Sequence, residues 1–538
     1  MGTIVTTPSG PIEGTSSGGV EVFRGVPYAQ PPVGGLRFRA PVPVSPWNEV
    51  RSARRFGKAA PQVGRANRLV RTFIGVADVA QSQDCLYLNV WTPVSDAARR
   101  PVMVWFHGGA FLLGSGSTMI YDGARLAHDG DVVVVTCNYR LGALGYLNWR
   151  SLAATTGDAL PETNLGLRDQ IAVLEWVRDH IECFGGDPGN VTIFGESAGA
   201  MSVGTLLGTP GAKGLFHAAI LQSGAAHNVT TPKQAALTAA HFFDGLGIDQ
   251  PSRELLEGLP VGDIMRAQLR TTTELGLLEG ILPFQPSVDG DVLPEPPLDA
   301  IRKGCARNVP VLCGTNRDEW KLFMFGDPRA RNLDEERLSR RFARVLARVG
   351  DQGPELARQA FETYYRVWGP RGGQPMERWV AFQSDRIFHY PAVRLADLQC
   401  VHDAQTYSYL FEWSPPVIGS RLGACHGLEL PFVFGTLRHP LLRPVWGSTP
   451  SAFRLSTYMQ RSWVAFARTG RPAHEDLPEW PAYTSERRST VTLGTKCDQR
   501  DDPHERARIF WGDVIRDTKI PWAGTEGVAA ADANHSEA

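Results

Sequence analysis

Residues 191–202 (VTIFGESAGAMS) hold a serine in a setting that can make it a nucleophile. A strand-like run, residues 191–194, leads into residues 195–199 (GESAG) and then into small residues that are compatible with a helix. We therefore expect a strand, a tight turn and a helix, with the Ser197 hydroxyl exposed at the turn above the helix N-terminus. Glycine on both sides leaves room where strand and helix cross. This context, more than the bare G-x-S-x-G pattern, predicts chemistry at Ser197.

A serine hydroxyl is a poor nucleophile at neutral pH, so it needs a base, and the base needs an acid that orients it. Among the 13 histidines, His426 is the best candidate for the base, because it lies in a Gly-rich coil between a predicted strand and a predicted helix. Asp318 and Glu319 both follow the end of a predicted strand, and either gives the order serine, acid, histidine. The residues alone leave these two carboxylates as alternatives.

A Gly-Gly loop follows the apolar run at residues 101–106 and reads HGGAF. Such a loop, at the C-terminal end of a buried strand, can point backbone N–H groups into a cleft, as an oxyanion hole requires. A phosphate-binding loop would need G-K-[ST] or G-x-G-x-x-G at the start of a helix, and residues 107–116 supply neither cleanly. We interpret His107 as a hydrogen-bonding residue that shapes the loop, not as a proton shuttle.

The elements that must position these residues alternate between strand and helix. A helix is predicted at residues 164–180, where apolar residues recur at the helical period. Strands are predicted at 84–92, 101–106, 131–137, 191–194, 217–224 and 405–412, and another helix at 456–470. Residues 309–320 predict a strand that ends in a turn with two carboxylates. This order predicts an α/β protein with a central, mostly parallel sheet flanked by helices. Residues 3–26 predict small antiparallel strands at one edge.

The chain is predicted to form one catalytic domain, residues 1–520. Two stretches, about 228–280 and about 327–380, have a helical and polar pattern without strand signals, so we expect helical insertions over the active site. The last residues, 521–538, are small and polar and are expected to be a disordered tail.

Composition limits the possible partners and compartments. The formal net charge is −1 and no basic patch stands out, which argues against nucleic-acid or anionic-membrane partners. There is no signal-like N-terminus and no stretch of the roughly 18 apolar residues that a membrane span needs. The eight cysteines are scattered, which suits reduced thiols and a cytoplasmic location. Neither a metal nor a cofactor is expected, because H-E-x-x-H and Cys/His clusters with ligand spacing are absent.

Longer stretches carry a family resemblance. Residues 184–199 (FGGDPGNVTIFGESAG) resemble the serine signature of the type-B carboxylesterases, the family of carboxylesterases and cholinesterases, and residues 84–91 (DCLYLNVW) resemble its second signature. Further stretches are similar to that family in the same order: FRGVPYAQPPVGGLRF, NYRLGALGYL, VDGDVLPEPP, CHGLELPFVFG and FARTGRPAHEDLPEWPAY. The resemblance covers about residue 4 to about residue 515. It implies an α/β-hydrolase fold and the hydrolysis of carboxylic esters.

The resemblance also implies a role for each matching residue. It makes Ser197 the nucleophile, Glu319 the triad acid and His426 the base of a reaction that passes through an acyl-enzyme. It assigns the oxyanion hole to the backbone N–H groups of Gly108, Gly109 and Ala198. It further implies that three polar side chains hydrogen-bond around the triad: Glu196, Ser223 and Glu429.

Three positions depart from the family pattern. The family usually pairs a glutamate with the arginine of the LRF stretch, whereas this chain has Gln83 and Arg37, so we expect at best a hydrogen bond to a neutral acceptor. No cysteine precedes Cys85, so the disulfide of vertebrate members is not possible there, and a free thiol is expected, as in a bacterial member. Trp320 replaces the glycine that commonly follows the acid, and we expect it near the pocket.

We expect a small-molecule ester substrate with a short to medium acyl chain or an aryl group. The residues predicted to line the pocket are Phe111, Phe284, Trp320 and Phe388. A carbamate or amide hydrolase would use the same triad and stays an alternative. A non-catalytic binding protein on the same fold is the alternative of a different class, although such relatives typically lose the serine. The sequence leaves monomer and small homo-oligomer open.

Overall fold

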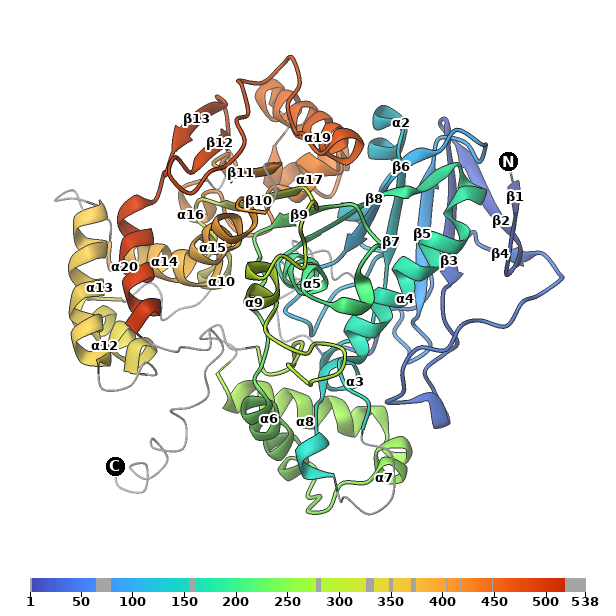
Figure 1. Ribbon diagram of the computed structural model, residues 1–538, viewed down its shortest axis with the longest axis horizontal. Helices are drawn as coiled ribbons and strands as arrows, with labels where there is room; N and C mark the ends of the chain where they lie inside the picture. Colours follow the sequence, from blue (N-terminus) through green and yellow to red (C-terminus); the bar gives the residue numbers. More distant parts are fainter. Residues whose placement is uncertain are drawn as a thin grey trace.

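The computed structural model describes residues 2–63, 79–153, 161–276, 282–325, 333–347, 352–368, 374–402, 405–416, 419–447 and 449–517. One large sheet runs through the middle of these residues, with helices on both sides (Figure 1). Its strands are β1 (Gly2–Thr7), β2 (Gly10–Ser17), β3 (Val20–Pro27), β4 (Arg51–Ser52), β5 (Tyr87–Thr92), β6 (Arg100–Phe106), β7 (Val133–Cys137), β8 (Gly186–Glu196), β9 (Ala218–Gln222), β10 (Val311–Asn316), β11 (Thr406–Phe411), β12 (Ser489–Leu493) and β13 (Asp498–Asp501).

The strands follow the order β1-β2-β3-β5-β7-β6-β8-β9-β10-β11-β12-β13, with β4 beside β2. From β7 to β12 all neighbours are parallel. At one edge β1, β2, β3, β5 and β7 pair antiparallel, and at the other edge β13 is antiparallel to β12. The predicted mostly parallel sheet and the antiparallel strands near the N-terminus are therefore confirmed.

Strand β6 illustrates why the central strands are apolar throughout. Val102, Val104 and Phe106 enter one hydrophobic core, while Met103 and Trp105 enter the core on the opposite face. Side chains alternate between the faces of a strand, so a strand that is covered on both faces needs an apolar residue at every position. The helices that cover the first face are α4 (Leu165–His180), α5 (Ala198–Leu207) and α15 (Tyr390–Gln399). Those on the other are α2 (Ala124–Gly130), α17 (Leu430–Val433) and α19 (Pro450–Thr469).

Two groups of helices extend beyond the sheet. Figure 1 shows α6 (Pro232–Asp244), α7 (Arg253–Gly258) and α8 (Val261–Glu274) at the bottom, and α12 (Glu335–Leu346), α13 (Gly353–Trp368) and α20 (Glu505–Asp517) at the left. With α14 (Pro375–Ser384) they contribute to a third apolar cluster, which also contains Ala198. Part of each predicted insertion, and the whole predicted tail 521–538, lie outside the described residues.

Short helices complete the chain: α3 (Gly142–Tyr146), α9 (Pro297–Arg302), α10 (Lys321–Met324), α16 (Gly419–Leu422) and α18 (Arg443–Trp446). Between α14 and α15 the chain forms one π-helical turn, Asp385–His389, which we call the π-turn. None of the helices within the described ranges is long and apolar enough to cross a lipid bilayer.

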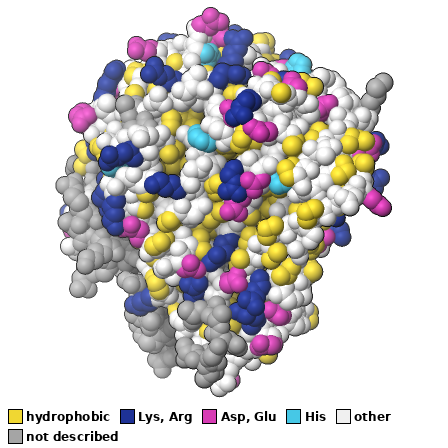
Figure 2. All heavy atoms as spheres, turned by 45° about the vertical axis from the view of Figure 1, so that its right-hand side comes forward, with side chains coloured by type: hydrophobic (Ala, Val, Ile, Leu, Met, Phe, Trp, Pro, Cys, Tyr) yellow, Lys and Arg dark blue, Asp and Glu magenta, His cyan; other side chains and the backbone are white. Residues whose placement is uncertain are grey.

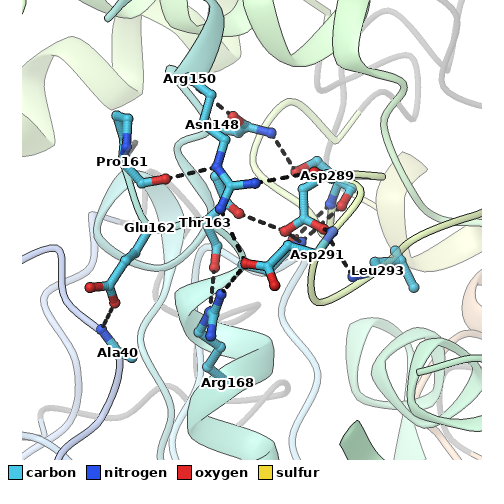
Figure 3. Close-up of polar contacts among 12 residues, drawn as sticks. Ala40, Asn148, Arg150, Pro161, Glu162, Thr163, Arg168, Asp289, Asp291 and Leu293 are labelled. Atoms are coloured by element: carbon cyan, nitrogen blue, oxygen red, sulfur yellow. Dashed lines mark hydrogen bonds and ion pairs between the residues drawn. The ribbon is translucent and has the colours of Figure 1, made fainter. Parts of the chain in front are cut away.

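A polar network fastens the Pro-rich coil before α9 to the start of α4 (Figure 3). Asp289 Oδ2 accepts a hydrogen bond of 2.6 Å from the Thr163 hydroxyl. Asp291 Oδ2 lies 3.2 Å from Arg150 Nη2 and 2.8 Å from Arg168 Nη2. One arginine comes from the segment before α4 and the other from α4, so the coil is held by two parts of the chain at once.

The surface carries charges of both signs. On the face drawn in Figure 2, the Lys and Arg side chains are interspersed with Asp and Glu, and apolar side chains lie between them. On α13, for example, Arg358 pairs with both Glu355 and Glu362. This pattern is that of a solvated helix face.

Candidate active site

Ser197 stands at the turn between β8 and α5, as the sequence predicts. Its backbone has φ 56° and ψ −126°, a strained conformation for a residue with a side chain. It is half-exposed, although residues 191–196 and 198–200 are buried. A Cβ on Gly195 would approach the Gly199 carbonyl carbon to 2.5 Å, and one on Gly199 would collide with the carbonyl oxygen of Phe106. Only glycine fits at these two positions, so the turn presents the serine and little else.

Glu319 and His426 face each other behind this turn. His426 Nδ1 donates a hydrogen bond of 2.6 Å to Glu319 Oε2, and both side chains are buried. The other carboxylate oxygen, Oε1, accepts a bond of 2.7 Å from the backbone N–H of Asn316, the last residue of β10. Both oxygens of Glu319 are therefore held, and one nitrogen of His426 is fixed.

Asp318, the alternative that the residues leave open, turns the other way. Its carboxylate lies 2.8 Å from Arg317 Nη2 and 3.3 Å from Lys321 Nζ, and it accepts a bond of 2.9 Å from the backbone N–H of Ala424. Burial would raise the pKa of Asp318, but the two cations outweigh it and lower this pKa. Asp318 thus links the loop that follows β10 to the loop that carries the histidine.

The second ring nitrogen of His426 faces another carboxylate. Nε2 lies 3.1 Å from Glu196 Oε1, yet neither atom has a partner in hydrogen-bond geometry among the described residues. Burial alone would lower the pKa of His426, but Glu196 and Glu319 raise it to about 9. Burial also raises the pKa of Glu196 to about 8. The two groups are strongly coupled, and the direction for His426 is upward because anionic carboxylates surround the imidazolium.

The Gly-Gly loop, residues 107–116, lies directly against the serine. A Cβ on Gly108 would be 3.0 Å from the Ser197 Cβ. Within the described residues, the backbone N–H groups of Gly108, Gly109 and Ala198 donate to no backbone carbonyl. The loop is strained beyond its glycines, because Ala110 and Phe111 both have positive φ, 56° and 59°. Strain of this kind accompanies functional loops, and here it leaves three N–H groups near one side chain unused.

His107 stabilises the loop from inside. Its ring stacks on Tyr139 at 4.4 Å, and its Nδ1 lies 2.8 Å from the carbonyl oxygen of Gly108. The Tyr139 hydroxyl donates a bond of 2.6 Å to the His107 carbonyl. Burial lowers the pKa of His107 to about 4, so the ring is neutral and Nδ1 donates to the carbonyl. These contacts agree with our interpretation that His107 shapes the loop.

The polar side chains expected around the triad differ in their contacts. Glu429 accepts from Gln222 Nε2 at 3.0 Å and from Asn316 Nδ2 at 2.6 Å. Ser223, with φ 52° just after β9, is buried, and its hydroxyl has no partner among the described residues. Among the described residues, the hydrogen bond that the resemblance implies for Ser223 is therefore not formed.

Aromatic rings flank His426. The ring of Phe388 lies 4.6 Å from the imidazole and that of Phe323 lies 5.3 Å from it. Trp320 packs on Phe323 at 4.5 Å. Phe323 is 47 % exposed, unusual for so large an apolar side chain beside a buried polar group. The sequence analysis missed Phe323, although its spacing of four residues from the acid places it on the same side of the following turn.

The other two aromatics predicted for the pocket are fully buried. Phe111 packs edge-on against Tyr146 at 5.1 Å, and Phe284 against Phe242 at 6.1 Å. Both belong to the apolar cluster that contains Ala198, so they support the wall behind the serine. Their contact with a substrate stays a prediction.

At the positions that depart from the family pattern, the structure shows no bond between Arg37 and Gln83 and a free thiol at Cys85. Arg37 does not bond to Gln83: its Nη1 donates to the carbonyls of Leu256 (3.2 Å) and Leu259 (2.6 Å). Arg37 Nε and Gln83 Oε1 are both buried without a partner among the described residues. All eight cysteines are free, and burial raises the pKa of the Cys85 thiol. The expected free thiol at position 85 is confirmed.

Two further features of the structure do not involve Ser197, Glu319 or His426. A cavity of about 590 Å³ opens between residues 61–63, residues 81–83 and helix α8, and neither Ser197, Glu319 nor His426 lines it. One group of side chains, Asp385, His389 and His504, brings possible metal-ligand atoms within 4.8 Å of one another. The sequence could not reveal this group, because His504 lies more than 100 residues after Asp385 and His389 along the chain.

A serine on a strained strand-to-helix turn of a mostly parallel sheet, followed along the chain by an acid and a histidine, defines the α/β-hydrolase class. Residues 1–511 match the carboxylesterase family, and the chain belongs to that family. The resemblance found in the sequence is thereby confirmed, and the protein is a carboxylic ester hydrolase.

The most informative relatives are bacterial. The chain is 41 % identical to the para-nitrobenzyl esterase of Bacillus subtilis over 94 % of its own length and 97 % of the relative's. It is 34 % identical to the phenmedipham hydrolase of Pseudarthrobacter oxydans, with 91 % and 95 % covered. The solved structure of a Geobacillus stearothermophilus carboxylesterase superposes with a TM-score of 0.82 at 40 % identity, covering 95 % of this chain and all of the other.

Proposed function

We propose that Ser197, His426 and Glu319 hydrolyse a carboxylic ester by a two-step acyl transfer. The single observation that carries this proposal is the arrangement of His426. Its Nδ1 is held by Glu319 at 2.6 Å, while its Nε2 has no hydrogen-bond partner among the described residues and stays available to take a proton.

In the first step, His426 takes the proton of the Ser197 hydroxyl as the oxygen attacks the ester carbonyl. The negative charge that develops on the carbonyl oxygen is stabilised by the N–H groups of Gly108, Gly109 and Ala198. His426 then gives its proton to the leaving alcohol. In the second step, water activated by the same ring releases the acid and restores the serine.

The surroundings of His426 favour compact acyl or aryl groups. Three aromatic rings form a continuous surface beside His426, the proposed general base: those of Phe323, Phe388 and Trp320. Such a surface packs well against a phenyl ring or a short alkyl chain. We therefore propose p-nitrobenzyl and short-chain p-nitrophenyl esters as substrates, in line with the name of the Bacillus relative. The eight free cysteines support a cytoplasmic location.

The test is hydrolysis of p-nitrophenyl esters from acetate to palmitate by wild type and by Ser197→Ala, with phenmedipham assayed beside them. We expect rapid turnover of short chains, and a loss of about 10⁴-fold or more in the variant. Labelling of the wild type, but not of the variant, by a fluorophosphonate probe locates the nucleophile. Activity that survives in Ser197→Ala would refute the assignment of the serine.

A further inference from the structure

The π-turn, Asp385–His389, and Ser384, the last residue of α14, contact the acid loop (residues 316–320) on the two sides of Glu319. His389 Nε2 lies 2.8 Å from the carbonyl oxygen of Asn316. The preceding Ser384 accepts a bond of 3.1 Å from the backbone N–H of Trp320. π-Helical turns are rare and often occur at functional sites. Here His389 of the turn and Ser384 just before it both bond to the loop that presents the acid.

The contacts of His389 define its protonation state. Its Nδ1 lies 2.7 Å from Asp385 Oδ1, so each ring nitrogen faces an oxygen. A neutral imidazole has a single N–H and can donate to only one of them. The other oxygen of Asp385 already accepts a bond of 2.8 Å from the Tyr364 hydroxyl, which itself accepts from Trp511 Nε1 at 2.8 Å. Asp385 Oδ1 is thus left to accept from His389, and an imidazolium that donates from both ring nitrogens satisfies both oxygens that face it.

We propose that His389 is a positioning residue: as an imidazolium paired with Asp385, it holds Asn316 and thereby fixes the carboxylate of Glu319 against His426. The proposal rests on the proposed function, because it assigns a support to that same acid and base. Asn316 is the point of connection, since its N–H donates to Glu319 and its side chain donates to Glu429 and to the carbonyl of Cys425.

The charged groups around His389 agree with a cation at this place. Asp385 faces it from its own turn and Glu319 from the acid loop, and together they raise the pKa of His389 although burial lowers it. The third neighbour, His504, stacks on His389 with ring centroids 4.6 Å apart, and burial together with the charge of His389 lowers the pKa of His504 to about 4. A neutral ring thus covers a charged one.

The same geometry disfavours a metal ion between Asp385, His389 and His504. The two imidazoles stack with only 18° between their planes, so their in-plane lone pairs point along nearly parallel planes and do not converge. Both nitrogens of His389 already lie at hydrogen-bond distance from oxygens. A structural zinc ion needs ligands that converge on one point.

The first experiment reads the protonation state directly. In protein labelled with ¹⁵N-histidine, His389→Gln identifies the missing ring signals by difference. We expect these to be the two N–H signals of an imidazolium, and we expect them to persist at pH 7, where a free histidine has lost most of its second ring proton. Signals of a neutral tautomer at pH 7, or stabilisation of the wild type by Zn²⁺ that the variant lacks, would overturn the proposal. This result does not depend on which residue is the nucleophile.

The second experiment separates positioning from simple structural support. In His389→Gln we expect kcat/KM to fall about tenfold, through a lower kcat. We also expect the acidic limb of the profile of kcat/KM against pH to move to higher pH by about half a unit, because His426 loses a nearby positive charge. Asp385→Asn should likewise lower kcat/KM and move this acidic limb to higher pH. Tyr364→Phe is the structural control, since it removes an outer hydroxyl and keeps both contacts of His389; it should lower Tm without moving the limb. An unmoved limb in both His389→Gln and Asp385→Asn would overturn the proposal.

Discussion

Replacing Glu196 by glutamine tests the electrostatics of the site most directly. The substitution keeps the shape of the side chain and removes the carboxylate that lies 3.1 Å from His426 Nε2. The base must be neutral to accept the serine proton, so its pKa sets the acidic limb of the profile of kcat/KM against pH. An anion beside the ring stabilises the charged form and raises this pKa, and its removal must lower it.

The magnitude follows from the distance. Two unit charges 3.1 Å apart interact by about 5 kcal/mol at an effective dielectric constant of 20. This would correspond to about 4 pH units if Glu196 were always ionised. Because its own pKa is raised to about 8, Glu196 carries a proton over much of the working range, and only part of the interaction is lost. We expect the limb to fall by about 1–2 pH units in Glu196→Gln.

The assay is kcat/KM for a short-chain ester between pH 5 and 9, followed in a pH-stat and normalised to the sites labelled by a fluorophosphonate. Glu162→Gln is the control, because it makes the same change at a half-buried carboxylate that pairs with Arg39. This control should leave the limb where it is. A limb that stays in place or rises in Glu196→Gln would refute the view that His426 Nε2 feels this carboxylate.

Three other substitutions address the loop and the core. Gly108→Ala places a methyl group 2.8 Å from the Glu196 carbonyl oxygen, which displaces a proposed oxyanion donor; kcat should fall on the order of 100-fold, as measured in the ester assay. Asp169→Asn breaks a buried bidentate ion pair to Arg140 (2.6 and 2.8 Å) and should lower the free energy of unfolding, measured in urea, by about 3–5 kcal/mol. Arg37 and Gln83 both line a cavity of about 10 Å³, and Gln83→Glu offers a carboxylate to the unpartnered Nε of Arg37. This substitution should raise the free energy of unfolding in urea by about 1 kcal/mol.

The parts of the site that sequence predicts are those built from contiguous residues. Strand β8, the turn at Ser197 and helix α5 follow one another within residues 186–207, so local patterns contain all the information. Gly195 and Gly199 indicate the close approach of strand and helix, and the apolar run of β6 indicates a strand covered on both faces.

Elements with weaker signals were missed or shortened. The predicted helix at 456–470 begins earlier, at Pro450, although Thr449 caps it and proline occupies its first position, a start signal that the sequence contains. Strands β12 and β13 have only five and four residues, too few to show a period. They form because β11 offers an open edge to β12.

The orientation of Asp318 and Glu319 shows why the rest could not be predicted from local pattern. They are neighbours at the end of one strand, and either could have faced the histidine. The choice depends on groups supplied by other segments: the N–H of Ala424 holds Asp318, and His426 holds Glu319. Information of this kind lies in tertiary contacts, and here only the family resemblance supplied it in advance.

This difference also predicts where the site tolerates change. The nucleophile turn is fixed by its own glycines and by the two elements that it joins, so distant substitutions should leave it intact. The acid and the base come from loops more than 100 residues apart, and both depend on Asn316, which three segments hold at once. Remote substitutions that reach Asn316 should therefore alter the pH profile of the reaction and slow the labelling of Ser197 by a fluorophosphonate, because the serine needs its base, while the turn that presents Ser197 stays folded.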